Sequence, residues 1–231
     1  MSETKYWCLN DMFHREDGPA IIYSDGTQIW YKNGKYHRKD GPAIIWEHGT
    51  EEWYFNGEKH REGGPAFIMP NGRQYWYQNG EYHRTDGPAK IWENGIQEWY
   101  FNGEKHRIDG PALIYPNGIE EWYKDGKRHR ENGPAVIYPN GKQFWYLNDK
   151  LHREDGPAKI SADGKQEWYL DGQRHRDDGP AIIYPAIIHS DGYQEWWLNG
   201  VRHCQQLRLS DDIKVKNITI NELQFNIRDG F

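Results

Sequence analysis

The chain has 231 residues, a formal net charge of −6 and a low share of hydrophobic residues, 36%, yet 15% of its residues are aromatic. Disordered chains are poor in aromatic residues, so this composition predicts a thin folded structure in which large rings are the main buried material. Acidic and basic residues are interspersed along the whole length, which argues against general affinity for nucleic acid, because that affinity normally needs a basic patch.

The chain begins with MSETKYW, which lacks the apolar segment of a secretory signal, and no stretch approaches the roughly 18 apolar residues of a membrane span. We therefore expect a cytoplasmic protein with no membrane span. Cys8 and Cys204 lie near opposite ends of the chain and could not meet in an extended array, so we expect two free thiols.

A repeat of 23 residues organises the sequence. The dipeptide His-Arg recurs at this interval from His14 to His175, and the next copy of the histidine, His203, follows 28 residues later. The five extra residues fall near 185–189, where PAII occurs for the second time, and predict a longer hairpin or a bulge. The chain thus divides into an N-terminal partial repeat or cap, about eight repeats and a C-terminal β cap, at residues 1–17, 18–203 and 204–231.

One repeat, residues 18–40, reads GPAIIYSDGTQIWYKNGKYHRKD and contains three turn signals. Asp25-Gly26 and Asn33-Gly34 are dipeptides favoured in tight hairpin turns, and Asp40-Gly41-Pro42 forms a third break. The segments between the breaks are only four to six residues long, which is the length of a strand. We therefore predict an all-β, elongated array of stacked β-hairpin repeats that forms an open twisted sheet or a solenoid.

The faces of the strands follow from the positions that vary among the repeats. Ala20 and Ile22 recur as Ala and Ile, while the position between them varies from Ile21 to Lys90, so we expect Ala and Ile to be buried. The recurrent Trp is expected to fill the core, with the variable position before it facing outward. The predicted core consists of Trp30, Trp53, Trp76, Trp99, Trp122, Trp145 and Trp168 together with Ile22, Ile45, Ile68, Ile91, Ile114 and Ile137.

The aromatic residue that follows each Trp is expected on the opposite, exposed face. Such a face, with the recurrent Arg, is a candidate surface for stacking sugars or single-stranded nucleic acid. The candidate binding face consists of Tyr31, Tyr54, Tyr77, Tyr100, Tyr123, Tyr146 and Tyr169 together with Arg38, Arg61, Arg84, Arg107 and Arg130.

The His-Arg-x-Asp motif has the residue types of a metal site or of a general acid/base pair. A catalytic centre needs one organised constellation, whereas this motif occurs eight times, with Gly63 and Asn132 in place of the Asp in two repeats. We therefore expect a structural role, in which Asp40 accepts hydrogen bonds from the turn or holds His37, and the Arg pairs with an acid. A ladder of metal-binding histidines is the alternative. We predict no catalytic residues, no metal and no cofactor.

The segment Tyr31-Lys32-Asn33-Gly34-Lys35-Tyr36-His37 resembles a MORN-type repeat, and especially its YwqK-like variant. The resemblance covers roughly residues 6–203. It departs from that pattern where the His is followed by Arg-x-Asp-Gly-Pro-Ala, a form similar to uncharacterised proteins of large phages and giant viruses. The resemblance implies an elongated sheet of successive hairpins, used in related families for protein or lipid contacts or for toxin neutralisation.

These features favour a non-enzymatic scaffold for protein–protein interaction, such as a phage or viral protein that binds or inhibits a host factor in the host cytoplasm. The alternative is a ligand-binding array for nucleic acid or carbohydrate along the Tyr/Arg face.

Overall fold

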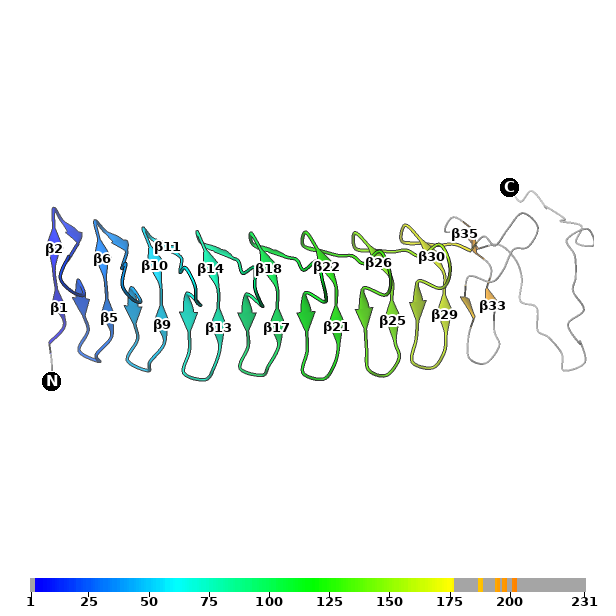
Figure 1. Ribbon diagram of the computed structural model, residues 1–231, viewed down its shortest axis with the longest axis horizontal. Helices are drawn as coiled ribbons and strands as arrows, with labels where there is room; N and C mark the ends of the chain where they lie inside the picture. The colour runs from blue at the N-terminus through cyan, green and yellow to red at the C-terminus, as the bar shows by residue number, and fades with distance from the viewer. Residues whose placement is uncertain (1–2, 177–186, 189–193, 196, 199–200, 203–231) are drawn as a thin grey trace, which may run out of the picture. The chain divides into compact units, whose positions relative to one another are not determined.

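The computed structural model describes residues 3–176, 187–188, 194–195, 197–198 and 201–202. In these residues all regular structure is β, in strands of two residues, β1 to β35, and the fold is an array of stacked hairpins (Figure 1). The chain divides into two compact units, residues 1–127 and 128–231, which are described separately. Among the described residues no helix is long and apolar enough to cross a membrane.

The first unit is organised around an antiparallel ladder whose strands pair in chain order. The ladder strands are β1 (Lys5–Tyr6), β4 (Ile21–Ile22), β5 (Gln28–Ile29), β8 (Ile44–Ile45), β9 (Glu51–Glu52), β12 (Phe67–Ile68), β13 (Gln74–Tyr75), β16 (Lys90–Ile91), β17 (Gln97–Glu98), β20 (Leu113–Ile114) and β21 (Glu120–Glu121).

A second set of strands forms one short hairpin per repeat, which we call the upper hairpins from their place in Figure 1. In the first unit these are β2 (Cys8–Leu9) with β3 (Met12–Phe13), β6 (Tyr31–Lys32) with β7 (Lys35–Tyr36), β10 (Tyr54–Phe55) with β11 (Glu58–Lys59), β14 (Tyr77–Gln78) with β15 (Glu81–Tyr82), and β18 (Tyr100–Phe101) with β19 (Glu104–Lys105). Two further strands, β22 (Tyr123–Lys124) and β23 (Lys127–Arg128), lie near the boundary of the units.

The second unit repeats this plan. Its ladder strands are β24 (Val136–Ile137), β25 (Gln143–Phe144), β28 (Lys159–Ile160), β29 (Gln166–Glu167), β32 (Ile187–Ile188) and β33 (Gln194–Glu195). Its upper hairpins are β26 (Tyr146–Leu147) with β27 (Lys150–Leu151), β30 (Tyr169–Leu170) with β31 (Gln173–Arg174), and β34 (Trp197–Leu198) with β35 (Val201–Arg202).

The turns form where the sequence predicts them. In the upper hairpin of residues 31–36, Asn33 has φ 51° and Gly34 has φ 74°, the two positive values that a tight Asn-Gly turn requires. In the ladder hairpin of residues 21–29, Gly26 has φ 99°, and the Tyr23 N–H donates to the Thr27 carbonyl at 2.9 Å. The prediction of a stacked β-hairpin array is therefore confirmed.

The ladder register sorts the strand residues into two rows on opposite faces. The inner row of the first unit is Tyr6, Ile21, Ile29, Ile44, Glu52, Phe67, Tyr75, Lys90, Glu98, Leu113 and Glu121, and that of the second includes Val136, Phe144, Lys159 and Glu167. The outer row alternates Ile with Gln or Glu and contains Ile22, Gln28, Ile45, Glu51, Ile68, Gln74, Ile91, Gln97, Ile114 and Glu120.

The predicted burial of the Ala column is confirmed, since Ala20 and its six described equivalents are 0% exposed. The predicted faces of the strand residues are wrong. Ile21 is 3% exposed, whereas Ile22 and the other five predicted core isoleucines are only half-buried. The reason is that rings of the upper hairpins, Phe13, Tyr31, Tyr36 and Tyr54, pack on the inner row and cover Ile21, Ile29 and Ile44.

The Trp column is likewise less buried than expected. Trp168 is 7% exposed, but Trp30, Trp53, Trp76, Trp99, Trp122 and Trp145 are half-buried. The position before each Trp was expected to face outward, but it belongs to the inner row. Ile29, Tyr75 and Glu98, which occupy this position in three repeats, are buried.

At the N-terminal end of the array, β1 pairs with β4. Within the predicted insertion at 185–189, Ile187–Ile188 forms β32 and pairs with β29. The C-terminal cap predicted at 204–231, and with it Cys204, lies outside the described residues, and Cys8 is a free, exposed cysteine.

Candidate binding surface

The recurrent Arg stacks on the recurrent Trp eight residues before it. The Arg38 Cζ lies 4.0 Å from the centroid of the Trp30 ring, and six other repeats have the same pair at 3.9–4.3 Å. The Arg38 Nη1 also donates to the Pro42 carbonyl at 3.2 Å, and a Cβ on Gly41 would lie 2.9 Å from Cζ. The Arg-x-Asp-Gly-Pro motif thus encloses a guanidinium between an indole ring and a glycine.

The recurrent His links each repeat to the next. The Nδ1 atom of His60 accepts the backbone N–H of Asn79, which is 19 residues later, at 3.1 Å. The same bond forms in other repeats, at Asn33, Asn56, Asn102, Asp125 and Asp171. The expected pairing of the Arg with an acid is confirmed at Arg15–Asp17, Arg84–Asp86 and Arg153–Asp155, at 2.7–2.8 Å. The His has a different partner from the one expected, because the turn residue of the next repeat takes the place of Asp40. Among the described residues no three His, Cys, Asp or Glu side chains are grouped as a metal site would require.

The Tyr column, predicted as exposed, packs on the inner side. The Tyr54 hydroxyl donates to the Glu52 carboxylate at 3.0 Å, and Tyr100, Tyr123 and Tyr169 make the equivalent bond. Burial, followed by the charge of Glu52, raises the pKa of Tyr54 above its usual value. Tyr31, Tyr77 and Tyr146, the remaining members, are also half-buried. Because Tyr faces the inner side and Arg stacks on Trp at the outer side, the two columns do not form one face.

The inner row contains two kinds of repeat, which the sequence analysis did not recognise. In one kind a Glu is followed seven residues later by Lys or Arg: Glu52 and Lys59 lie 3.0 Å apart, and Glu98 and Lys105 lie 3.1 Å apart. In the other kind both positions are apolar or aromatic, as in Ile29 with Tyr36, Tyr75 with Tyr82, and Phe144 with Leu151. Within each repeat the two positions change together, so that Glu occurs with a basic residue and an apolar residue occurs with another apolar or aromatic one. Paired changes at positions i and i+7 are the sequence signal that reveals the two kinds of repeat.

The buried carboxylates of the inner row form hydrogen bonds and ion pairs. Burial alone would raise the pKa of Glu98, but a 2.6 Å bond from the Trp92 indole N–H and the charge of Lys105 outweigh it, so the pKa lies below its usual value. Glu167 is 1% exposed and contacts Lys159 at 2.8 Å and Arg174 at 3.6 Å. These carboxylates hold the two layers together.

The outer side contains a series of hollows between successive His-Arg-x-Asp-Gly-Pro loops. One hollow of about 720 Å³ in the first unit is lined by Arg38 to Pro42 of one repeat and by Trp53, Phe55, His60 and Arg61 of the next. Two hollows of about 520 and 420 Å³ in the second unit have Leu147 and Leu170 in the place of Phe55. Each hollow therefore combines a Trp, an apolar residue two positions later and a His seven positions after the Trp.

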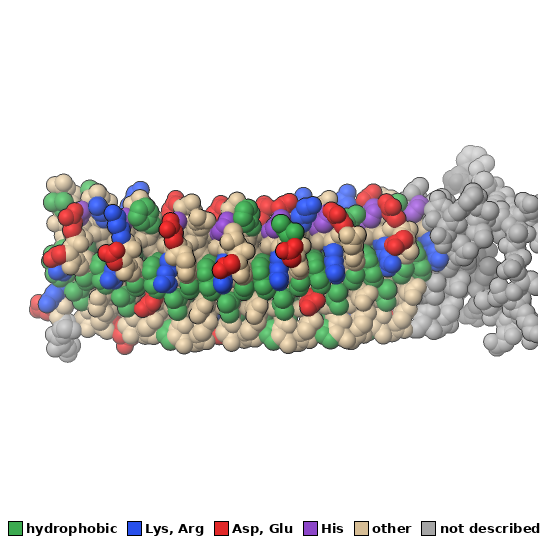
Figure 2. Space-filling view, in the orientation of Figure 1, with side chains coloured by type: hydrophobic (Ala, Val, Ile, Leu, Met, Phe, Trp, Pro, Cys, Tyr) green, Lys and Arg blue, Asp and Glu red, His purple; other side chains and the backbone are tan. Residues whose placement is uncertain are grey.

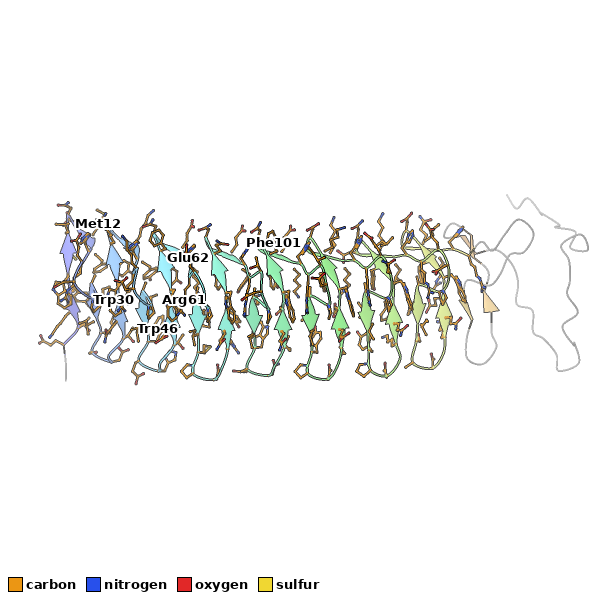
Figure 3. All side chains as sticks on the ribbon, viewed as in Figure 1. Met12, Trp30, Trp46, Arg61, Glu62 and Phe101 are labelled. Atoms are coloured by element: carbon orange, nitrogen blue, oxygen red, sulfur yellow. The ribbon has the colours of Figure 1, made fainter. Side chains whose placement is uncertain are left out.

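The column of residues two positions after each Trp differs most between repeats on this side, and the sequence analysis missed it. It runs Lys32, Phe55, Gln78, Phe101, Lys124, Leu147 and Leu170. Phe55 and Phe101 are 42% and 46% exposed, and each lies 4.8 Å, between ring centroids, from the His of the preceding repeat. Figure 3 shows Phe101 on its upper hairpin, above the level of Trp30 and Arg61, where the upper hairpins join the ladder.

On the face seen in Figure 2, basic side chains recur at regular intervals in the first unit, with hydrophobic ones between them and acidic ones beside them.

No protein-family model matches the chain, and a search of curated proteins finds no match either. The assignment to a MORN-like family, and to its YwqK-like variant, therefore stays a prediction.

Proposed function

We propose that the protein is a non-enzymatic repeat scaffold that binds another protein along the outer hollows. The observation that carries this proposal is the recurrence of one Trp-lined hollow with a variable apolar residue, at Phe55, Leu147 and Leu170. Protein interfaces are enriched in aromatic and Arg side chains, and pockets lined by them take up the anchoring residues of a partner.

The His and Arg side chains, which are the residue types with catalytic potential, make structural contacts, and this supports a non-enzymatic role. The His column accepts backbone N–H groups, and the Arg column stacks on indole rings and donates to carbonyls. In the part of the chain that the structure describes, neither column pairs a nucleophile with a base, the arrangement that covalent catalysis uses.

A protein partner is favoured over the nucleic acid or carbohydrate of the alternative. That alternative requires Tyr rings and guanidinium groups on one exposed face, whereas Tyr54 bonds to Glu52 on the inner side and Arg61 stacks on Trp53. With the resemblance to phage and giant-virus proteins, the proposal extends to a host factor bound in the host cytoplasm.

The test is a pull-down from cell lysate with nuclease-treated and untreated samples of the wild type and two variants. The hollow variant replaces Phe55, Phe101, Leu147 and Leu170 with Ser. The control variant replaces Tyr23, which is exposed but lies at the turn of a ladder hairpin, with Ser. We expect partner proteins that resist nuclease, persist with the control variant and disappear with the hollow variant. Loss of every partner on nuclease treatment, or retention of all partners by the hollow variant, would refute the proposal.

A further inference from the structure

Two outer sites in the first unit are built alike. The nine residues Trp53–Arg61 and Trp99–Arg107 have the same sequence, WYFNGEKHR. Phe55 lies 4.8 Å from His37 and 6.2 Å from His60, and Phe101 lies 4.8 Å from His83 and 6.2 Å from His106. The repeat between them has Gln78 at the equivalent position, so the two exposed Phe rings are separated by one polar repeat.

The ladder fixes the spacing of the two Phe sites. From β9 to β17 the chain crosses β12, β13 and β16, so four strand-to-strand steps separate the repeats of Phe55 and Phe101. Adjacent strands lie about 4.8 Å apart, which places the sites about 19 Å from each other. An extended peptide advances about 3.3 Å per residue and covers that distance in six residues, whereas a helix needs about 13.

The surroundings of the Phe sites are acidic. Glu58, Glu81 and Glu104 are exposed at the upper hairpins, and Glu62 and Asp109 are exposed on the adjoining loops. Asp86 pairs with Arg84 at 2.7 Å, and the exposed Lys39 lines the Phe55 hollow, so the exposed acids outnumber the exposed cation. The lysines of the same repeats, Lys59, Lys90 and Lys105, point to the inner side, where Lys59 and Lys105 pair with Glu52 and Glu98 and Lys90 lies over the Tyr82 ring. The Arg side chains stack on Trp53, Trp76 and Trp99. A partner with positive charge is therefore complementary to this region.

We propose that the Phe55 and Phe101 sites together bind one extended, basic peptide segment that carries two apolar side chains six residues apart. The inference rests on the proposed function and names its partner class. Each site takes one apolar side chain against Phe, Trp and His, and the acids on both sides attract the Lys and Arg residues between and beside the anchors. At the Phe101 site Ile108, 87% exposed, holds the place of Glu62 and adds apolar surface.

The test is selection of a displayed library of random 14-residue peptides on the full chain. We expect enriched peptides to be positively charged and to carry two apolar residues with a separation of six. The single variants Phe55→Ser and Phe101→Ser should each weaken a selected peptide at least tenfold, because one anchor is lost, while Tyr23→Ser, at an exposed turn of a ladder hairpin, should leave its affinity unchanged.

A matched rearrangement tests the spacing itself. The double variant Gln78→Phe with Phe101→Gln keeps the composition but moves the second Phe one repeat closer to Phe55, about 10 Å away by the same strand spacing. The selected separation should then shorten from six residues to two or four, the even numbers that keep both anchors on one face of an extended peptide. Circular dichroism and thermal unfolding confirm that the variants are folded.

The inference is overturned if no peptide is enriched, if enriched peptides are acidic or have one anchor, or if the separation does not follow the moved Phe. If the peptide selection fails but the pull-down still recovers nuclease-resistant partners that the hollow variant loses, the proposed function stands and only the present inference is refuted. Loss of those partners as well would remove both.

Discussion

The inner and outer sides of the same hairpins differ in how their variable positions are used. On the inner side Glu52 occurs with Lys59 and Tyr75 with Tyr82, so a change at one position is compensated within the repeat. On the outer side the column that includes Phe55 and Gln78 varies while its Trp, Arg and His neighbours stay the same. The comparison teaches that variation between repeats is functional evidence only where no partner in the fold compensates for it.

The largest expected effect comes from breaking one inner pair. Lys59→Tyr leaves the buried Glu52 carboxylate without its cation and should lower the free energy of unfolding by about 2 kcal/mol. Adding Glu52→Ile reproduces the Ile29/Tyr36 pair and should bring stability to within about 1 kcal/mol of the wild type. Urea denaturation of the wild type, both single variants and the double variant gives the coupling energy. Additive effects of the two substitutions would contradict the matched-pair interpretation.

The next effect concerns the invariant part of the outer side. A Cβ at position 41 would meet the Arg38 guanidinium at 2.9 Å and displace it from Trp30, so Gly41→Ala should cost about 1–2 kcal/mol. In an Arg38→Ala background the same substitution should cost less than about 0.5 kcal/mol, because the crowding is gone. Equal costs in both backgrounds, again by urea denaturation, would show that the glycine is needed for another reason.

A smaller effect is expected at the link between repeats. His60→Ala removes the acceptor of the Asn79 N–H and should destabilise the protein by about 1 kcal/mol. Hydrogen exchange of the Asn79 amide should accelerate, while the Asn102 amide, whose acceptor is His83, serves as the internal control. Unchanged protection of Asn79 would mean that this bond does not hold successive hairpins together.

The smallest effect should appear at the variable outer column. Phe55→Gln, which copies the residue of the next repeat, removes an exposed ring and should change the free energy of unfolding by less than about 0.5 kcal/mol. Tyr75→Gln, at a buried inner position, is the matched comparison and should cost several times more. A cost above about 1 kcal/mol for Phe55→Gln would indicate that this column stabilises the fold.

Much of the fold follows from local signals in the sequence. Asn33-Gly34 can adopt two positive φ values, and the short segments between turn residues are too brief for helices, so hairpins at a 23-residue interval were predictable. The faces were not. Hydropathy favours burial of the invariant Ile22 over a position occupied by Lys90, yet the inner row buries Glu98 because Lys105 and Trp92 satisfy its carboxylate.

The candidate site, like the fold, was predictable from the sequence only in part. The recurrence of His-Arg-x-Asp indicated a structural motif, but the stacking of Arg38 on Trp30 and the bond from His60 to the next repeat depend on neighbours eight and 19 residues away. Phe55 became a candidate binding residue only when the structure placed it in an outer hollow, and Phe101 when the structure showed its ring equally exposed.

The sequence by itself determined the period, the turns and the β class of this protein, because each depends on the backbone preferences of a few adjacent residues. The tertiary structure decided which side of the ladder is covered. A period of two defines two faces without ranking them, and only the packing of the upper hairpins against Ile21, Ile29 and Ile44 makes one of them the interior.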